Sequence, residues 1–170
     1  MTSRKVYDAE RCAHFVTCSC FHRRKLLDAD PIKLLIISEL KASLSTNAGH
    51  CLGYVVMPSH VHAIVWLPES SKVSKFMNRW KSGSSHHVKH WLQQHRPKYV
   101  DQTTPNDAVW QAGFYDFNLE SQEKIEEKLD YMHLNPVRAK LVERAVDWPW
   151  SSARWYIEGR SVGVDISWPE

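Results

Sequence analysis

The stretch from Cys51 to Leu67 restricts the fold of this chain more than any other part of its sequence. It contains two apolar, β-branched segments, 51–57 and 60–67, that meet at Met57-Pro58-Ser59. Pro58 cannot donate a hydrogen bond to a strand ladder and suits a turn, so we predict two strands joined tightly around it. An antiparallel pair of strands is therefore the starting point for the fold.

His60 and His62 open the second of these strands. Side chains two residues apart on a strand point the same way, so both imidazoles project together while Val61 faces the opposite side. Two adjacent imidazoles form half of a metal site, and the remaining ligands have to come from elsewhere in the chain. The competing interpretation is a pair of structural histidines on an otherwise apolar strand.

The rest of the chain alternates between strand and helix signals. Residue patterns predict further strands at 13–21, 108–111 and 114–117, and helices at 31–44, at 72–94 and after Ser121. Ser82-Gly83-Ser84 is a candidate break in the second helix. The order strand, helix, strand, strand, helix, strand, helix fits an α+β, ferredoxin-like antiparallel sheet with helices packed mainly on one face.

Length and composition favour one globular domain over 1–170, with 157–170 as a C-terminal tail of undecided order. No apolar stretch approaches the roughly 20 residues of a membrane span, and Met1-Thr2-Ser3-Arg4-Lys5 lacks the apolar core of a signal peptide. We therefore expect a cytoplasmic protein. The four cysteines are too few for a disulfide framework, and Cys18 and Cys20 are expected to be small residues on one face of a strand.

Residues 71–100 form a basic segment that contains no Asp or Glu. Its seven positive charges are Lys72, Lys75, Arg79, Lys81, Lys89, Arg96 and Lys98. Counterion release makes contacts between such a segment and phosphate favourable, so the segment points to nucleic acid. A solvated basic helix face is the alternative interpretation.

Tyr131 and Asn135 lie about one helical turn apart on the helix predicted after Ser121. Both sit to one side of the apolar stripe, so they can face a cleft while the helix stays anchored. The stripe consists of Ile125, Leu129 and Met132. Pro136 places the helix end at Asn135. His133 lies on the opposite flank and is expected to be a structural or surface residue.

Together these residues suggest a metal-assisted nuclease. Two imidazoles and one amide oxygen leave coordination positions open for phosphate and water. A divalent cation there would polarise and orient a phosphate for attack by Tyr131, whose weak nucleophilicity requires positioning and nearby positive charge. A covalent phosphotyrosine stores the phosphodiester bond, so such an enzyme suits strand transfer better than degradation.

Four motifs follow one another along the chain: Met57-Pro58-Ser59-His60-Val61-His62, Val109-Trp110-Gln111-Ala112-Gly113-Phe114-Tyr115, Tyr131-Met132-His133-Leu134-Asn135-Pro136-Val137-Arg138-Ala139 and Trp148-Pro149-Trp150-Ser151-Ser152. In this order they resemble the REP-associated tyrosine transposases, single-tyrosine enzymes of the HUH class (His, hydrophobic residue, His). The resemblance covers roughly residues 5–157. It implies the ferredoxin-like fold that the element order already predicts.

The resemblance also implies a role for each site residue. His60, His62 and Asn135 would be metal ligands, Mg²⁺ or Mn²⁺ the cation, and Tyr131 the nucleophile that forms a 5′-phosphotyrosine. Because the ligand set is softer than Mg²⁺ prefers, Mn²⁺ is expected to bind more tightly in vitro. The implied partner is single-stranded DNA folded into hairpins from repetitive extragenic palindromes, near the nucleoid of a bacterium. A monomer with its site completed in cis is expected, and a dimer that exchanges the tyrosine helix is the alternative.

The basic residues then acquire roles at the DNA. Those expected to hold the hairpin or its flank are Arg23, Arg24 and Lys25, and those expected to track phosphates near the site are Arg79, Lys81, Arg138 and Lys140. The candidates for stacking on unpaired bases are Trp80, Trp91 and Trp110, although most of the eight tryptophans must belong to the core. Trp148-Pro149-Trp150 is expected to be a packing clamp.

Two other functions stay open at this point. One is a domesticated protein that binds hairpin DNA without cutting it, and the other is a metalloprotein with a closed four-ligand zinc site. The tail at 157–170 either docks on the domain or covers the DNA groove. A covalent adduct with DNA separates the leading hypothesis from both alternatives.

Overall fold

A four-stranded antiparallel sheet forms the centre of the computed structural model, which describes residues 12–98 and 108–170. Its strands are β1 (Ala13–Ser19), β2 (His50–Val56), β3 (His60–Trp66) and β4 (Tyr115–Leu119), in the order β2-β3-β1-β4. β2 and β3 are the predicted hairpin, with Val56 opposite Val61 beside the turn. The topology confirms the predicted ferredoxin-like fold.

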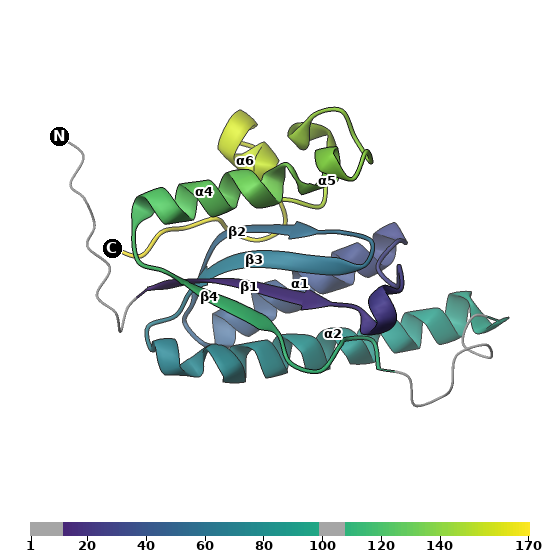
Figure 1. Cartoon of the computed structure of the whole chain (residues 1–170). Coiled ribbons are helices and arrows are strands. Elements are labelled where there is room, and N and C mark those ends of the chain that lie inside the picture. Colours follow the sequence, from purple (N-terminus) through teal and green to yellow (C-terminus); the bar gives the residue numbers. More distant parts are fainter. Residues whose placement is uncertain (1–11, 99–107) are drawn as a thin grey trace.

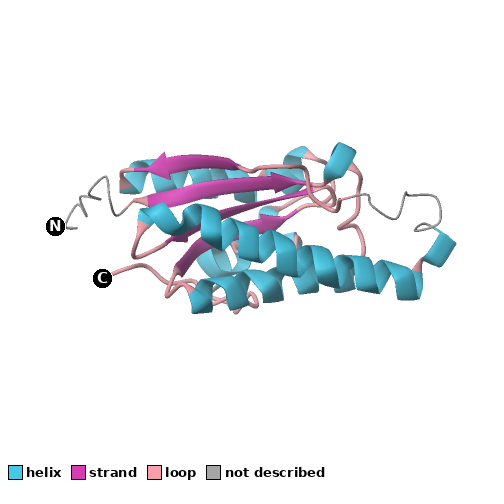
Figure 2. Ribbon diagram, turned by 90° about the horizontal axis from the view of Figure 1, so that it is seen from below, coloured by secondary structure: helices cyan, strands magenta, loops and turns pink. Residues whose placement is uncertain are grey.

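Helices cover both faces of this sheet (Figure 1). The two long helices α1 (Asp30–Thr46) and α2 (Val73–His95) lie on one face, and α4 (Gln122–His133) lies on the other. Two short helices, α5 (Asn135–Arg138) and α6 (Ala153–Glu158), accompany α4. The longest helices share one face as predicted, and α4 adds a second layer. Figure 2 shows from below how the helices cover part of the sheet.

Alternation along the strands divides the core into two clusters. On β3, Val61, Ala63 and Val65 belong to the cluster under α1 and α2, whereas Ile64 belongs to the cluster under α4. The two histidines share the parity of Ile64, so the sheet presents them on the α4 face. Register thus places the candidate metal ligands opposite the larger core cluster.

The segment Ser82-Gly83-Ser84 does not break α2, which runs unbroken from Val73 to His95. Ser84 is buried and its hydroxyl donates to the Trp80 carbonyl, while Trp110 Nε1 donates to the Ser84 Oγ. Gly83 leaves room for the side chain of Glu39 on α1, whose carboxylate pairs with His87. These small residues therefore serve close packing between helices rather than a chain break.

The predicted inward face of α2 is correct except at its end. Five of the six predicted inward positions are buried: Val73, Phe76, Met77, Trp80 and Val88. Near the end of the helix the buried residue is Leu92, while the predicted Trp91 is half-buried and stacks on His95 with ring centroids 4.5 Å apart.

α4 begins and packs as the sequence predicts. The Ser121 hydroxyl accepts from the Lys124 backbone N–H at 3.2 Å, which is an N-cap bond. The stripe of Ile125, Leu129 and Met132 is buried. On β2, Gly53 allows the helix to come close, because a Cβ there would collide with Leu129 and Met132. This close approach fixes the height of α4 above the sheet.

The segment after α5 closes the free edge of β2. Trp148 Nε1 donates to the Val56 carbonyl at 3.0 Å, and the Ser152 N–H donates to the Tyr54 carbonyl at 2.9 Å. The ammonium of Lys33 on α1 lies 5.6 Å from the ring centroid of Trp148 and 5.7 Å from that of Trp150. This arrangement is the packing clamp predicted for these tryptophans.

The C-terminal tail continues along the same strand. The Ser167 N–H donates to the Cys51 carbonyl at 3.0 Å, and the side chain of Ile166 is buried. The Tyr54 hydroxyl donates to the Val162 carbonyl. Of the two placements considered for 157–170, the structure therefore has the tail docked on the domain.

Cys18, Cys20 and Cys51 are buried thiols outside any disulfide, in agreement with the prediction for Cys18 and Cys20. Burial raises the pKa of the Cys20 and Cys51 thiols to about 12. None of the helices in the described part combines the length and apolar character that a bilayer crossing needs. The segment at 1–5 and most of the predicted loop after His95, at 99–107, lie outside the described residues.

Candidate active site

The two histidines of β3 lie side by side on the α4 face of the sheet. Their ring centroids are 4.8 Å apart, and His62 is 7% exposed. Thr17, directly across the strand pair from His62, places its Oγ1 2.7 Å from His62 Nδ1. Phe15 stacks on the same imidazole with centroids 5.3 Å apart. These contacts fix the ring and engage Nδ1, so Nε2 is the His62 atom available to a ligand.

Burial keeps both imidazoles in their neutral form. It lowers the pKa of His62 to about 3, with further contributions from the charges of His60 and Lys128. Burial also lowers the pKa of His60, assisted by the positive charge of Arg23. A neutral imidazole has a free lone pair, which is the form that binds a metal ion.

Tyr131 and Asn135 lie over this pair from the end of α4 and the start of α5. The ring centroids of Tyr131 and His62 are 5.9 Å apart. The amide Nδ2 of Asn135 is 3.4 Å from His60 Nε2. Because the oxygen and nitrogen of an amide exchange places by rotation, the Asn135 oxygen reaches the same point. The four predicted site residues therefore converge within one chain.

Two cations flank the ring of Tyr131. The Arg138 guanidinium lies 4.9 Å from the ring centroid and donates to the Tyr131 carbonyl at 2.9 Å. The Lys128 ammonium lies 5.5 Å from the same centroid. Tyr131 as a residue is 43% exposed, so it lies at the surface beside positive charge. Such surroundings suit a hydroxyl that attacks a phosphate.

The sequence reasoning missed Thr17, Phe15 and Lys128. Lys128 precedes Tyr131 by three residues on one flank of α4, so helical spacing alone could have identified it. Thr17 meets His62 only through the pairing of β1 with β3, and the two are 45 residues apart in sequence. That contact requires the strand register.

The donor set fits a divalent cation with open coordination positions. It offers two neutral imidazoles and one amide oxygen, which is fewer ligands than a closed structural site uses. Among residues 12–98 and 108–170, no three His, Cys, Asp or Glu side chains gather in a group that could hold a metal ion. The described residues therefore give no support to a closed zinc site made of these side chains.

The loop after β1 brings part of its predicted basic cluster near the histidines. The positive charge of Arg23 helps to lower the pKa of His60. Arg23 and Lys25 are both exposed. Arg24 is half-buried, and its guanidinium donates to the Phe21 and Ala108 carbonyls at 3.2 and 3.3 Å. Lys140 is exposed just beyond α5. Arg23 is thus a member of the cluster whose charge reaches a candidate metal ligand.

Two predicted stacking contacts with DNA bases need correction. Trp80 is 2% exposed and its Nε1 donates to the Ile36 carbonyl at 3.1 Å, so its ring is part of the core and cannot stack on a base. Trp110 is also buried and its Nε1 donates to the Ser84 Oγ, so its ring belongs to the core as well. The Lys81 ammonium is held by the carbonyls of Gln111 and Gly113. These bonds anchor that turn, and a contact between Lys81 and phosphate stays a prediction.

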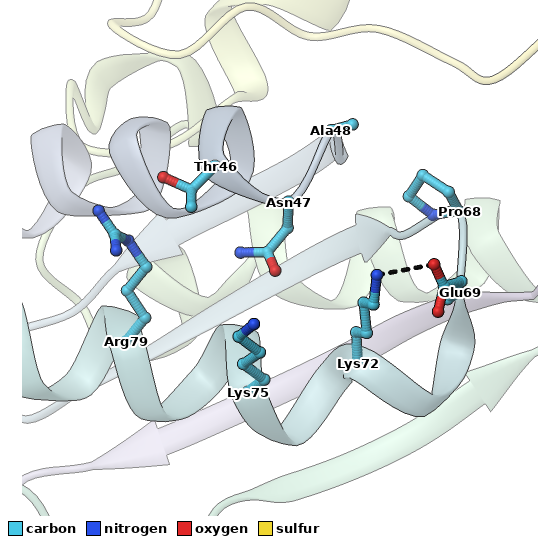
Figure 3. A pocket seen from close by; sticks show the side chains of 8 residues that line it. All are labelled: Thr46, Asn47, Ala48, Pro68, Glu69, Lys72, Lys75 and Arg79. Atoms are coloured by element: carbon cyan, nitrogen blue, oxygen red, sulfur yellow. Dashed lines mark hydrogen bonds and ion pairs between the residues drawn. The ribbon is translucent and has the colours of Figure 1, made fainter.

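Arg79 lies away from the histidines, on the face covered by α1 and α2. It lines a pocket of about 410 Å³ between the end of α1 and the start of α2, together with Lys72, Lys75 and Asn47 (Figure 3). Lys72 pairs with Glu69 at 2.7 Å. Cations beside a helix C-terminus complement its dipole, which explains this group without a ligand. Arg79 is therefore placed on the face away from the histidines, and a contact between it and DNA phosphate stays a prediction.

His133 has the structural role that its flank predicts. It is 7% exposed and forms a hydrogen bond with Ser152 Oγ at 2.7 Å. Burial lowers the pKa of His133 to about 4. The residue thus ties α4 to the segment that closes the β2 edge.

This chain is similar to known transposases. The family model for IS200-like transposases matches residues 9–135. Over 99 residues the chain is 27% identical to the REP-associated tyrosine transposase of Escherichia coli, which covers 58% of this chain and 51% of that protein. The chain thus spans about half the length of this relative. A Haemophilus influenzae protein assigned provisionally to the same group is 22% identical over 125 residues, covering 68% of each chain.

A solved structure shares the whole fold. It is described as a REP-associated tyrosine transposase bound to a REP hairpin. The two chains superpose with a TM-score of 0.70 at 20% identity, over 100% of this chain and 94% of the other. At this identity the likeness establishes the fold alone.

Proposed function

This chain belongs to the IS200-like transposase family, and on that premise we propose that it cuts and rejoins single-stranded DNA through Tyr131. The observation that carries the proposal is the position of Tyr131 beside His62 in the same chain, with ring centroids 5.9 Å apart. A tyrosine needed only for packing would not be 43% exposed between two cations. A nucleophile needs this access.

The reaction consists of two transfers at one phosphorus atom. The Tyr131 oxygen attacks the scissile phosphate, the bond to the 3′ oxygen of the DNA breaks, and a 5′-phosphotyrosine and a free 3′ hydroxyl result. The phenolic proton leaves to solvent and the departing 3′ oxygen takes up a proton. A 3′ hydroxyl of another strand then attacks the phosphotyrosine and releases Tyr131. The number of phosphodiester bonds is conserved, so no external energy source is needed.

His60, His62 and Asn135 would hold the divalent cation, Mg²⁺ or Mn²⁺. Bound there, the cation would polarise the scissile phosphate and orient it for in-line attack. The chain itself keeps both imidazoles neutral by burial and orients His62 through Thr17. Arg138 lies over the Tyr131 ring. The protein's contribution is therefore positioning and electrostatic stabilisation.

The substrate we propose is single-stranded DNA folded into hairpins from repetitive extragenic palindromes. This assignment follows the names of the Escherichia coli relative and of the hairpin-bound structure. Arg23, Lys25, Arg138 and Lys140 are the exposed cations near the site that would meet its phosphates. The proposal also includes a monomer, because one chain supplies both the histidines and the tyrosine.

The test is a covalent adduct between the protein and a hairpin oligonucleotide. In Mn²⁺ or Mg²⁺ the wild-type protein should shift to higher mass on a denaturing gel, and chelation with EDTA should prevent the shift. Tyr131→Phe should give no adduct. Tyr156→Phe is the matched control, since it removes a phenolic hydroxyl that donates to the Leu52 carbonyl away from the site. An equal adduct from Tyr131→Phe would refute the proposal, as would tight hairpin binding without an adduct in any cation.

A further inference from the structure

The two edges of the sheet differ in their cover. The edge of β2 pairs with later parts of the chain, through Val55 with Ser151 and Cys51 with Ile166. β4 is the opposite edge, and among the described residues it pairs only with β1. Its first four residues, 115–118, are exposed. An open edge strand next to an active site is a surface on which a substrate can lie.

Two aromatic side chains project from β4 toward the catalytic side. Tyr115 is 55% exposed and Phe117 is 40% exposed. They stand opposite Thr17 and Phe15 on β1, the residues that contact His62. Their parity places both rings on the α4 face, in continuity with Tyr131. Residues two apart on a strand are roughly 6.8 Å apart, about twice the 3.4 Å spacing of stacked bases.

Lys128 adds a positive charge to this surface. Its ammonium lies 5.5 Å from the ring centroids of Phe117 and Tyr131, and 5.4 Å from that of Phe15. Within the described part of the chain, no acidic side chain pairs with it. The nearby Asp116 points to the other face, where it pairs with His14 at 3.0 Å. The surface therefore carries rings and a cation without a neutralising carboxylate.

We infer that Tyr115, Phe117 and Lys128, here called the β4 platform, bind the single-stranded DNA next to the scissile phosphate. Bases stack on the two rings, and Lys128 contacts the phosphate between them and Tyr131. The ring spacing requires an extended strand whose bases are separated from one another. The inference rests on the proposed function, because it gives the strand held at Tyr131 a path across the sheet edge.

The chemistry of the platform favours DNA over a protein partner. Every base has a flat π face, so stacking on aromatic rings binds single strands regardless of their sequence. A protein surface covering β4 would bury the Lys128 ammonium, which is costly unless an acid pairs with it. A phosphodiester supplies that negative charge at regular intervals. Burial in folding does not explain exposed rings at 115 and 117.

The experiment measures equilibrium binding of a fluorescent, unstructured oligonucleotide to protein carrying Tyr131→Phe, so that no cleavage interferes. Tyr115→Ala and Phe117→Ala should each weaken binding about fivefold or more, and Phe117→Trp should retain it. Lys128→Gln should reduce the slope of log affinity against log salt by about 0.7, the value for one phosphate contact on a single strand. Leu34→Ala, an equally exposed apolar residue on α1, should bind as the parent does.

Photocrosslinking provides a second measurement. An oligonucleotide with 5-iododeoxyuridine beside the cleavage position should crosslink to Tyr115 or Phe117. Unchanged affinity in the Tyr115→Ala, Phe117→Ala double variant would overturn the inference. A second result would also overturn it. If the double variant has a lower mass than its parent in light scattering but the same DNA affinity, the substitutions have dissociated a dimer, and a second copy of the chain covers β4. Adduct formation is scored separately, so a missing adduct with platform-dependent binding refutes only the proposed chemistry.

Discussion

The two faces of the sheet are built from alternate residues of the same strands, but they have different roles. Under α1 and α2, the strands contribute small and branched apolar residues such as Val61 and Ala63, and the face is closed. Under α4, apolar packing around Ile64 gives way to His60 and His62, where the helix ends. One face stabilises the fold, and the other holds polar groups at the boundary of the packed layer. The comparison predicts that stability and activity separate by face.

The largest expected effect is the loss of activity in His62→Ala. Adduct formation should fall by about a hundredfold or more, because even residues that only support a metal ligand cost 10- to 100-fold when mutated. Unfolding in urea should stay cooperative, since the site lies at the edge of its core. Phe76→Ala on the opposite face is the counterpart, with an expected loss of about 3–5 kcal/mol of stability. Equal losses of stability in both variants would remove the distinction between the faces.

Thr17→Val tests whether the catalytic face depends on orientation as well as on ligands. The valine keeps the side-chain shape and removes the 2.7 Å contact with His62 Nδ1. Mn²⁺ affinity measured by calorimetry should fall about 10- to 100-fold, while the free energy of unfolding should change by only about 1 kcal/mol. Thr17→Ser retains the hydroxyl and should bind Mn²⁺ as the wild type does. Normal Mn²⁺ binding by Thr17→Val would show that Thr17 has no role at the site.

Acid should weaken the α4 face through His133. Burial lowers its pKa to about 4 in the folded protein, below the usual 6.5, so only the unfolded chain takes up a proton between these values. Stability from this group is therefore complete above pH 6.5 and is lost as pH falls toward 4. Between pH 7 and pH 5 the expected loss is about 2 kcal/mol. Urea titrations at both pH values measure it, and His133→Gln should show a correspondingly smaller loss.

The last prediction is that two inactive variants do not restore each other's activity. A mixture of Tyr131→Phe and His60→Ala proteins should form no adduct, because one chain contributes both halves of the site. Restored cleavage in the mixture would mean that two chains exchange α4. Each variant alone serves as the baseline for the mixture.

The parts of the molecule fixed by local pattern could be predicted from sequence. Pro58 marked the turn of the hairpin, and the stripe of Ile125, Leu129 and Met132 set the rotation of α4, which placed Tyr131 beside the site shortly before Asn135 begins α5. Strand parity was enough to put His60 and His62 on one face. These inferences depend on residues close together in the chain.

The parts of the molecule fixed by contacts between distant segments could not be predicted from sequence. Arg79 and Lys81 sit in one basic helix, yet one lines a pocket against α1 and the other anchors the turn at Gln111, because α2 packs on the face away from the site. Ser84 was predicted to be part of a helix break, because its hydrogen-bond partner Trp110 comes from a distant segment. Charge in a segment showed an affinity for phosphate without showing which face the segment would take.

The measurement that tests the central claim most directly is the mass of the DNA-linked peptide. After reaction with a hairpin oligonucleotide, nuclease trimming and trypsin digestion, the peptide 129–138 should carry a nucleotide through a phosphate on Tyr131. Fragmentation should place the added mass on that residue. A nucleotide on any other residue, or complete reaction with peptide 129–138 unmodified, would contradict the account.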